Sequence, residues 1–93
     1  MKYFDWDVGK NEMLKNEREV SFEDTIEEII SGELIDIMEH PNKKKYPNQK
    51  FYIVNLRGYV YMIPYVENDQ KIFLKTIFPS RKMTEIYKKK GAI

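Results

Sequence analysis

The chain has 93 residues, with 16 basic and 15 acidic residues and no cysteine. This length predicts a single domain spanning residues 1–93 with one modest core, and the lack of cysteine excludes a disulfide framework and a thiolate metal site. No apolar run reaches the roughly 20 residues of a membrane span or resembles a signal-peptide core. We therefore expect a cytoplasmic protein without a membrane partner.

The chain is expected to begin with an edge strand and a short helix. Lys2–Trp6 alternates weakly between apolar and polar residues, which is compatible with a strand at the edge of a sheet. Asp7 is a suitable N-cap for a helix over Gly9–Glu17. At helical spacing, Met13 and Leu14 are its expected inward residues.

A stronger helix is predicted near residues 22–31. Ser21 is followed three residues later by an acid, as in a capping box, and Gly32 provides a natural end. Leu34–Met38 then alternates like a short strand. The inward residues of this helix are expected to be Phe22, Ile26, Ile29 and Ile30.

Three runs rich in β-branched and aromatic residues follow a polar loop, His40–Gln49. They lie near residues 50–56, 59–66 and 71–78 and predict a three-stranded antiparallel meander. Arg57-Gly58 suits a two-residue hairpin loop, and Glu67–Gln70 suits a polar turn. These loops predict the pairs Leu56–Tyr59, Val54–Tyr61 and Tyr52–Ile63 in the first hairpin, and Tyr65–Ile72, Ile63–Leu74 and Tyr61–Thr76 in the second.

Both faces of this meander are predicted to be largely apolar. One carries Tyr52, Val54, Leu56, Tyr59, Tyr61, Ile63, Tyr65, Ile72, Leu74 and Phe78, and the other carries Phe51, Ile53, Asn55, Val60, Met62, Pro64, Val66, Phe73, Lys75 and Ile77. We expect helices to cover one face and either the terminal segments or a partner to cover the other. Pro64 lacks an N–H and predicts a bulge or a locally unpaired edge.

A last helix, residues 81–90, is expected after Ser80, with Met83, Ile86 and Tyr87 on one face. The charges are segregated along the chain. Residues 19–39 contain eight acidic residues and no Lys or Arg, whereas residues 71–90 contain seven basic residues and one acid, Glu85. The segregation indicates either solvated surfaces or a localised site for phosphates.

Several short stretches resemble BrnT-type toxins. The resemblance begins with Phe4–Asp7, Lys10-Asn11, Leu14 and Val20–Asp24, and it returns with Thr76-Ile77, Ser80–Thr84 and Tyr87. It implies an α+β fold of the RelE/ParE kind: a small antiparallel sheet, made of the meander and one or two edge strands, with two N-terminal helices and one C-terminal helix. It also implies a ribonuclease toxin neutralised by a cognate antitoxin, often a ribbon-helix-helix protein, with DNA contacted only through that complex.

Metal-free RNA cleavage needs a base for the 2′-hydroxyl, a cation for the phosphorane charge and an acid for the leaving oxygen. The candidate catalytic residues are Arg81, Lys82, Lys75, His40 and Tyr87. Further RNA-binding candidates are Arg57, Lys43, Lys44, Lys45 and Thr76. Arg81 is preferred as the phosphate clamp because its guanidinium is bidentate and follows Ser80 at a helix start. We expect neither a metal nor a cofactor, since the acids of the second helix lack a partner at ligand spacing.

Other interpretations remain open. His40 is the only histidine, and a solvated loop position beside Pro41 is favoured over a catalytic role, because a lone histidine is weak evidence for catalysis. Tyr59, Tyr61 and Tyr65 lie on one predicted face, where they either stack RNA bases or form part of the core. The same fold also suits a non-catalytic protein-interaction module or a sequence-tolerant RNA-binding module.

Overall fold

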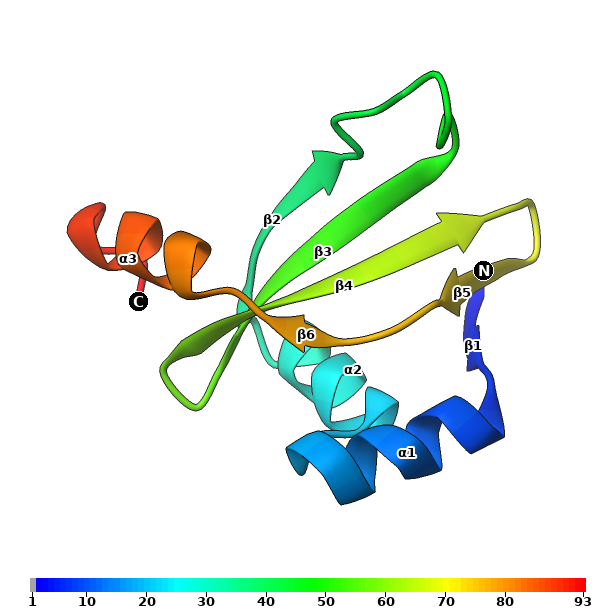
Figure 1. The fold of residues 1–93 in the computed structure, drawn as a ribbon, viewed down its shortest axis with the longest axis horizontal. Coiled ribbons are helices and arrows are strands. Elements are labelled where there is room, and N and C mark those ends of the chain that lie inside the picture. Colours follow the sequence, from blue (N-terminus) through cyan, green and yellow to red (C-terminus); the bar gives the residue numbers. More distant parts are fainter. Residues whose placement is uncertain (1) are drawn as a thin grey trace.

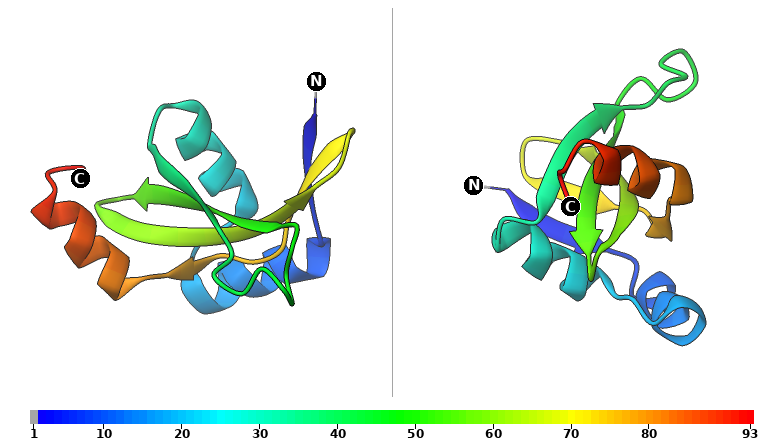
Figure 2. Two further views of the ribbon diagram at one scale, coloured as in Figure 1. Left: turned by 90° about the horizontal axis from the view of Figure 1, so that it is seen from above. Right: turned by 90° about the vertical axis from the view of Figure 1, so that its left-hand side faces the viewer.

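A computed structural model describes residues 2–93 (Figures 1 and 2). Its elements are β1 (Tyr3–Trp6), α1 (Val8–Arg18), α2 (Phe22–Ile30), β2 (Leu34–Glu39), β3 (Gln49–Leu56), β4 (Tyr59–Glu67), β5 (Lys71–Leu74), β6 (Phe78–Pro79) and α3 (Arg81–Lys89). The predicted α+β class, with two helices before the meander and one after it, is confirmed. Among the described residues, no helix is both long and apolar enough to cross a bilayer.

The sheet is mixed rather than antiparallel. Its strands lie in the order β1-β5-β4-β3-β2, and β6 pairs with β4. β1 runs parallel to β5, while the other pairs are antiparallel. The prediction of a purely antiparallel sheet is therefore wrong at this edge. A parallel neighbour needs a long connection, and the chain from α1 to β4 supplies it.

The first hairpin has the predicted register. Leu56 pairs with Tyr59, and the pairing continues through the central residues of β3 and β4. Arg57 and Gly58 have φ values of 56° and 83°, which is the left-handed geometry that a tight two-residue hairpin requires. The Gly58 N–H also donates to Asn55 Oδ1 at 2.9 Å, which holds the turn closed.

The second hairpin is displaced by two residues from the predicted register. Tyr65 pairs with Leu74 and Glu67 with Ile72. The turn closes around Asn68, whose side-chain oxygen accepts the N–H groups of Gln70 at 2.8 Å and Lys71 at 3.0 Å. Because the displacement is even, Ile72 and Leu74 keep their predicted face.

The predicted third strand, residues 71–78, is interrupted after Leu74. The Lys75 N–H donates to the Pro64 carbonyl at 2.8 Å. The N and C=O of one strand residue face the same neighbouring strand, but the Pro64 nitrogen carries no hydrogen and cannot donate the second hydrogen bond of this pair. The ladder breaks there, which confirms the local loss of pairing predicted at Pro64. After the break Ile77 is fully buried in the core, whereas Phe78 pairs with Met62. The predicted faces of Ile77 and Phe78 are therefore reversed.

The main core lies between the sheet and the first two helices, on what we call the helix-pair face. Leu14, Val20 and Phe22 pack here against the central strands. The sheet contributes Tyr52, Val54, Leu56, Ile63, Tyr65, Leu74 and Ile77. Burial of Tyr65 supports the core interpretation of that tyrosine, whereas Tyr59 stays 37% exposed at the hairpin.

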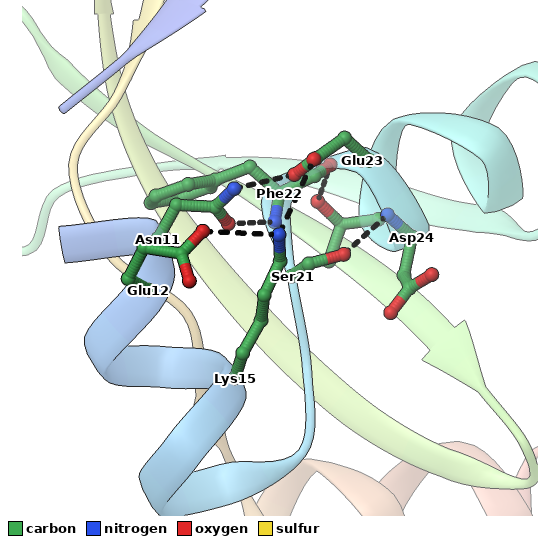
Figure 3. Close-up of polar contacts among 8 residues, drawn as sticks. Asn11, Glu12, Lys15, Ser21, Phe22, Glu23 and Asp24 are labelled. Carbon is green, nitrogen blue, oxygen red and sulfur yellow. Dashed lines mark hydrogen bonds and ion pairs between the residues drawn. The ribbon is translucent and has the colours of Figure 1, made fainter. Parts of the chain in front are cut away.

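Asn11 joins the two helices (Figure 3). Its side-chain oxygen accepts the Phe22 N–H at 2.8 Å and its amide donates to Glu23 at 2.5 Å. Asn11 is buried, whereas Met13, predicted to face inward, is 38% exposed. α1 is therefore rotated about its axis relative to the prediction, because the Asn11 amide faces α2 and accepts the N–H at the start of that helix.

Ile30 is also placed differently from the prediction, since it is 77% exposed. Thr25 takes an inward position of α2 instead and is fully buried. Its hydroxyl donates to the Phe22 carbonyl at 2.8 Å, so burial leaves no unpaired polar group.

The opposite side of the sheet, which we call the α3 face, is covered in part by the C-terminal helix. Figure 2 (right) shows α3 in front of the sheet, away from α1 and α2. The Val60 N–H donates to Thr84 Oγ1 at 2.9 Å, and both Val60 and Ile53 are fully buried. The expectation that a terminal segment wraps the second face is therefore confirmed for this part of it.

Candidate functional site

The predicted cations near the C-terminus lie on one stretch, residues 75–82, which we call the β5–α3 segment. Its backbone is fixed to the central strand β4 at both ends. The Lys75 N–H donates to Pro64, and the Ser80 N–H donates to the Val60 carbonyl at 2.9 Å. From the other side, the Arg18 guanidinium of α1 donates to the Ile77 carbonyl at 2.5 Å. These contacts hold the segment at the sheet although β5 and β6 are not continuous.

Ser80 determines where α3 begins. Its hydroxyl accepts the Met83 N–H at 3.2 Å, as predicted for an N-cap. The Thr84 hydroxyl donates to the Ser80 carbonyl at 2.7 Å, which ties the cap to the buried side of the helix. The N–H groups of Arg81 and Lys82 lie in the first turn, where helix geometry offers no intrahelical acceptor. They add partial positive charge beside two cationic side chains.

Lys75, Arg81 and Lys82 are exposed. Among residues 2–93, ion pairs are formed by Lys2, Lys15, Lys43 and Lys71, and none includes a side chain of the β5–α3 segment. Thr76 is half-buried between Lys75 and the core residue Ile77. The segment therefore presents an exposed cationic surface that the described part of the chain does not neutralise.

His40 lies in an aromatic cluster at the β2–β3 loop. Its ring centroid is 4.4 Å from that of Tyr46 and 5.4 Å from that of Phe51. The Asn42 N–H donates to His40 Nδ1 at 3.0 Å, so a neutral ring carries its proton on Nε2. His40 thus stacks on the α3 face against Phe51, whose backbone pairs with Pro64 and lies about two strand spacings, roughly 10 Å, from that of Lys75.

The remaining candidates lie elsewhere. The Tyr87 hydroxyl is 3.5 Å from Asp36 Oδ2, and burial, followed by the nearby carboxylate, raises the pKa of Tyr87. Arg57 donates to the Glu19 carbonyl at 3.4 Å at the first hairpin. Lys43, Lys44 and Lys45 lie in the loop at the other end of β3, and Lys43 pairs with Glu39. A strand of eight residues separates Arg57 from this loop, or about 26 Å.

The structure thus brings Lys75, Thr76, Arg81 and Lys82 into one short segment, with His40 across the same sheet face. It does not bring Arg57 or the three loop lysines to this segment. Tyr87 shares α3 with Arg81 but contacts Asp36 on β2. Among the described residues, no group of three or more His, Cys, Asp or Glu side chains is arranged to hold a metal ion.

One feature was not predicted from the sequence. A groove of about 420 Å³ lies between β1 and α2 and is lined by Trp6, Glu23, Ile26, Glu27, Ile30 and Ser31. Phe22, Ile26, Ile29 and Ile30 form an apolar arc of about 100°, which is the ordinary width of a core-facing stripe, so α2 alone gave no signal of a groove. The contribution of Trp6 depends on tertiary packing.

Comparisons of the chain with protein-family models, with curated proteins and with solved structures find no match.

Proposed function

We propose that the chain is the toxin of a type II toxin–antitoxin pair and cleaves RNA without a metal. The proposal includes a RelE/ParE-like arrangement of the α+β fold. It also includes a cognate antitoxin of ribbon-helix-helix character through which any DNA contact is made. It is supported by the resemblance of Phe4–Asp7, Val20–Asp24 and Ser80–Thr84 to BrnT-type toxins. The observation that carries it is the exposed set of cations at the β5–α3 segment, free of ion pairs with other described residues.

Arg81 is assigned the central role. Its guanidinium can bind two phosphate oxygens at once, and the open N–H groups of the first α3 turn favour the same anion. Lys75 and Lys82 add positive charge from either side, and Thr76 offers a hydroxyl to the RNA backbone. Charge is greatest on the phosphorane, so these groups stabilise the transition state more than the bound RNA.

Proton transfer has a smaller part in this proposal. With Nδ1 accepting from Asn42, His40 presents an N–H at Nε2 and suits donation to the leaving 5′-oxygen. Tyr87 keeps its proton at neutral pH, since the ordinary pKa of tyrosine is 10.0 and burial raises the pKa of Tyr87 further. Neither side chain is poised as a base, and we therefore expect most of the rate enhancement to come from the cations.

The first test is the chemistry of the products. Attack by the 2′-oxygen on phosphorus breaks the bond to the 5′-oxygen and leaves a 2′,3′-cyclic phosphate and a 5′-hydroxyl. We expect the purified chain to produce these ends from mRNA in the presence of EDTA, and its induced expression to arrest bacterial growth. Intact RNA with folded protein at high concentration would refute the proposal.

The second test is Arg81→Ala, which should lower the cleavage rate on the order of 10²–10³-fold, as the loss of one oxyanion donor does. Arg81→Lys should recover only part of the rate, since a point charge replaces a fork. His40→Ala should have a smaller effect. Lys89→Ala, an exposed cation in the last turn of α3, is the matched control. Melting temperatures close to that of the unmodified chain show that the variants fold, and full activity of Arg81→Ala would remove Arg81 from the site.

A non-catalytic interaction module is the second candidate function, and the groove beside α2 favours it. RNA binding without cleavage would instead favour the sequence-tolerant RNA-binding module. Two measurements separate these three functions. Only the toxin gives cyclic phosphate ends, and only the two RNA-directed functions lose RNA affinity in Arg81→Ala.

A further inference from the structure

The groove between β1 and α2 combines an apolar floor with an acidic rim. Trp6 and Ile26 are half-buried, whereas Ile30 is 77% exposed at one end. Glu23 and Glu27 stand on the same stripe of α2, at helical spacing from Ile26 and Ile30. None of its lining residues belongs to the β5–α3 segment, so binding in this groove does not depend on RNA cleavage.

Trp6 and Ile26 pack against the edge of the core but stay half-buried, and Ile30 lies outside the core cluster. Phe22 and Thr25 supply the fully buried positions of α2, and the hydroxyl of Thr25 is hydrogen-bonded. Ile30 lies beyond them, in solvent. An exposed apolar surface next to a hollow is characteristic of an interaction site.

Trp6 gives the groove a rigid aromatic wall. Its ring stacks on Phe22 with centroids 5.9 Å apart and an angle of 28° between the planes. Because Phe22 is fully buried, this contact fixes the orientation of the indole from the core side. A held aromatic side chain loses little conformational entropy when a ligand binds, which is why tryptophan is common among residues that dominate binding energy.

The rim is negative, and no basic residue of α2 or β2 compensates it, because residues 19–39 contain none. Lys15 of α1 lies 3.7 Å from Glu23, and Asn11 donates to the same carboxylate (Figure 3). The Asn11 hydrogen bond is the largest cause that lowers the pKa of Glu23 below 4.5, a value at which a carboxyl group is already ionised at neutral pH. Among the described residues, Glu27 forms no ion pair.

We infer that this groove binds an amphipathic helix of a partner protein that carries Leu, Ile or Val on one face and Lys or Arg beside it. The apolar face would contact Trp6, Ile26 and Ile30, and the cations would pair with Glu23 and Glu27. The lining consists of helix and strand side chains at helical spacing, which suits helix-in-groove packing. Complementary charge fixes the orientation of the bound helix and excludes acidic partners.

Trp6 is the only tryptophan and therefore reports directly on the groove. The probe is a synthetic helix of about 15 residues, with Leu on one face, Lys on the flanks and no aromatic residue. Adding it to the full chain should shift the Trp6 emission to shorter wavelength with saturation. A second peptide with Glu in place of Lys should bind at least about tenfold more weakly, since it repels the rim.

Two variants locate the binding site. Ile30→Ser should weaken the Lys peptide about tenfold through lost apolar contact, and Glu27→Lys should weaken it severalfold, more so at low salt. Ile37→Ser on β2, 48% exposed and outside the groove, is the matched control and should bind normally. Any one of three results would overturn the inference: no emission change at millimolar peptide, equal binding of the Glu peptide, or unchanged affinity of Ile30→Ser. Concentration-dependent self-association that Ile30→Ser abolishes would also overturn it, by placing a second copy of the chain in the groove.

Discussion

The two faces of the sheet are covered in different ways. On the helix-pair face, α1 and α2 bury a continuous apolar cluster centred on Leu14, Phe22 and Val54. On the α3 face, a single helix is attached through Thr84 and Ser80, and a loop with His40 covers Phe51. Apolar packing dominates the first cover, and specific polar contacts position the second.

Because of this difference, we expect different residues to determine folding stability and the proposed RNA cleavage. Burial of large apolar side chains supplies most of the folding free energy, so the helix-pair face should determine whether the chain folds. The cations of the β5–α3 segment are exposed and unpaired within the described chain, so their replacement should leave folding nearly unchanged. Substitutions on the two faces therefore test separate properties.

The largest effect is expected on the helix-pair face. Phe22→Ala removes a fully buried ring that also stacks on Trp6, and it should lower the free energy of unfolding by about 3–5 kcal/mol. Urea denaturation measures this change. Met13→Ala on the neighbouring helix is the control and should cost much less, since Met13 is 38% exposed. Equal losses of unfolding free energy in the two variants would show that burial of the side chain does not determine its contribution to stability.

A smaller effect is expected where α3 meets the sheet. Thr84→Val keeps the shape of the side chain but leaves the buried Val60 N–H without its acceptor, at a cost of about 1–3 kcal/mol. Hydrogen exchange at Val60 should accelerate, whereas Thr84→Ser keeps the hydroxyl and should behave as the unmodified chain does. Unchanged exchange in Thr84→Val would show that apolar contacts alone hold α3.

The smallest effect concerns the acidic rim of the groove. The Asn11 amide, more than Lys15, lowers the pKa of the Glu23 carboxyl from its ordinary value of 4.5. A depressed pKa in the folded state contributes stability above pH 4.5, and this contribution is lost as the pH falls through the folded value. NMR titration should show that Asn11→Ala raises the pKa more than Lys15→Ala does. The reverse order would identify charge rather than hydrogen bonding as the main cause.

Local signals explain how much of this fold the sequence predicts. The register of the first hairpin follows from Arg57-Gly58, because a two-residue loop allows only one pairing between the residues of the two flanking strands. The register of the second hairpin differs from the prediction because any residue of Glu67–Gln70 can form a polar turn. The hydrogen bonds accepted by the Asn68 side chain determine where this turn closes. The break after Leu74 depends on Pro64, a residue on another strand.

The same distinction applies to the candidate site. The cations of the β5–α3 segment are neighbours in the chain, so the sequence alone groups them. His40 reaches the same sheet face only through strand pairing, while Arg57 and the loop lysines are carried to opposite ends of β3. The groove lies between Trp6 and a stripe of α2 about 20 residues later in the chain, and no local sequence pattern predicts that contact.

The parallel pairing of β1 with β5 affects the order in which the chain can fold during synthesis. Tyr3 pairs with Lys71 and Trp6 with Leu74, and the ion pairs Lys2–Glu67 and Lys71–Asp5 lie at the same edge. β1 must therefore wait for β5, which is translated on the order of ten seconds later at typical elongation rates. Until then Trp6 has no strand beside it, and the wall of the groove is missing. A partner that recognises this groove would select chains whose sheet is complete over nascent ones.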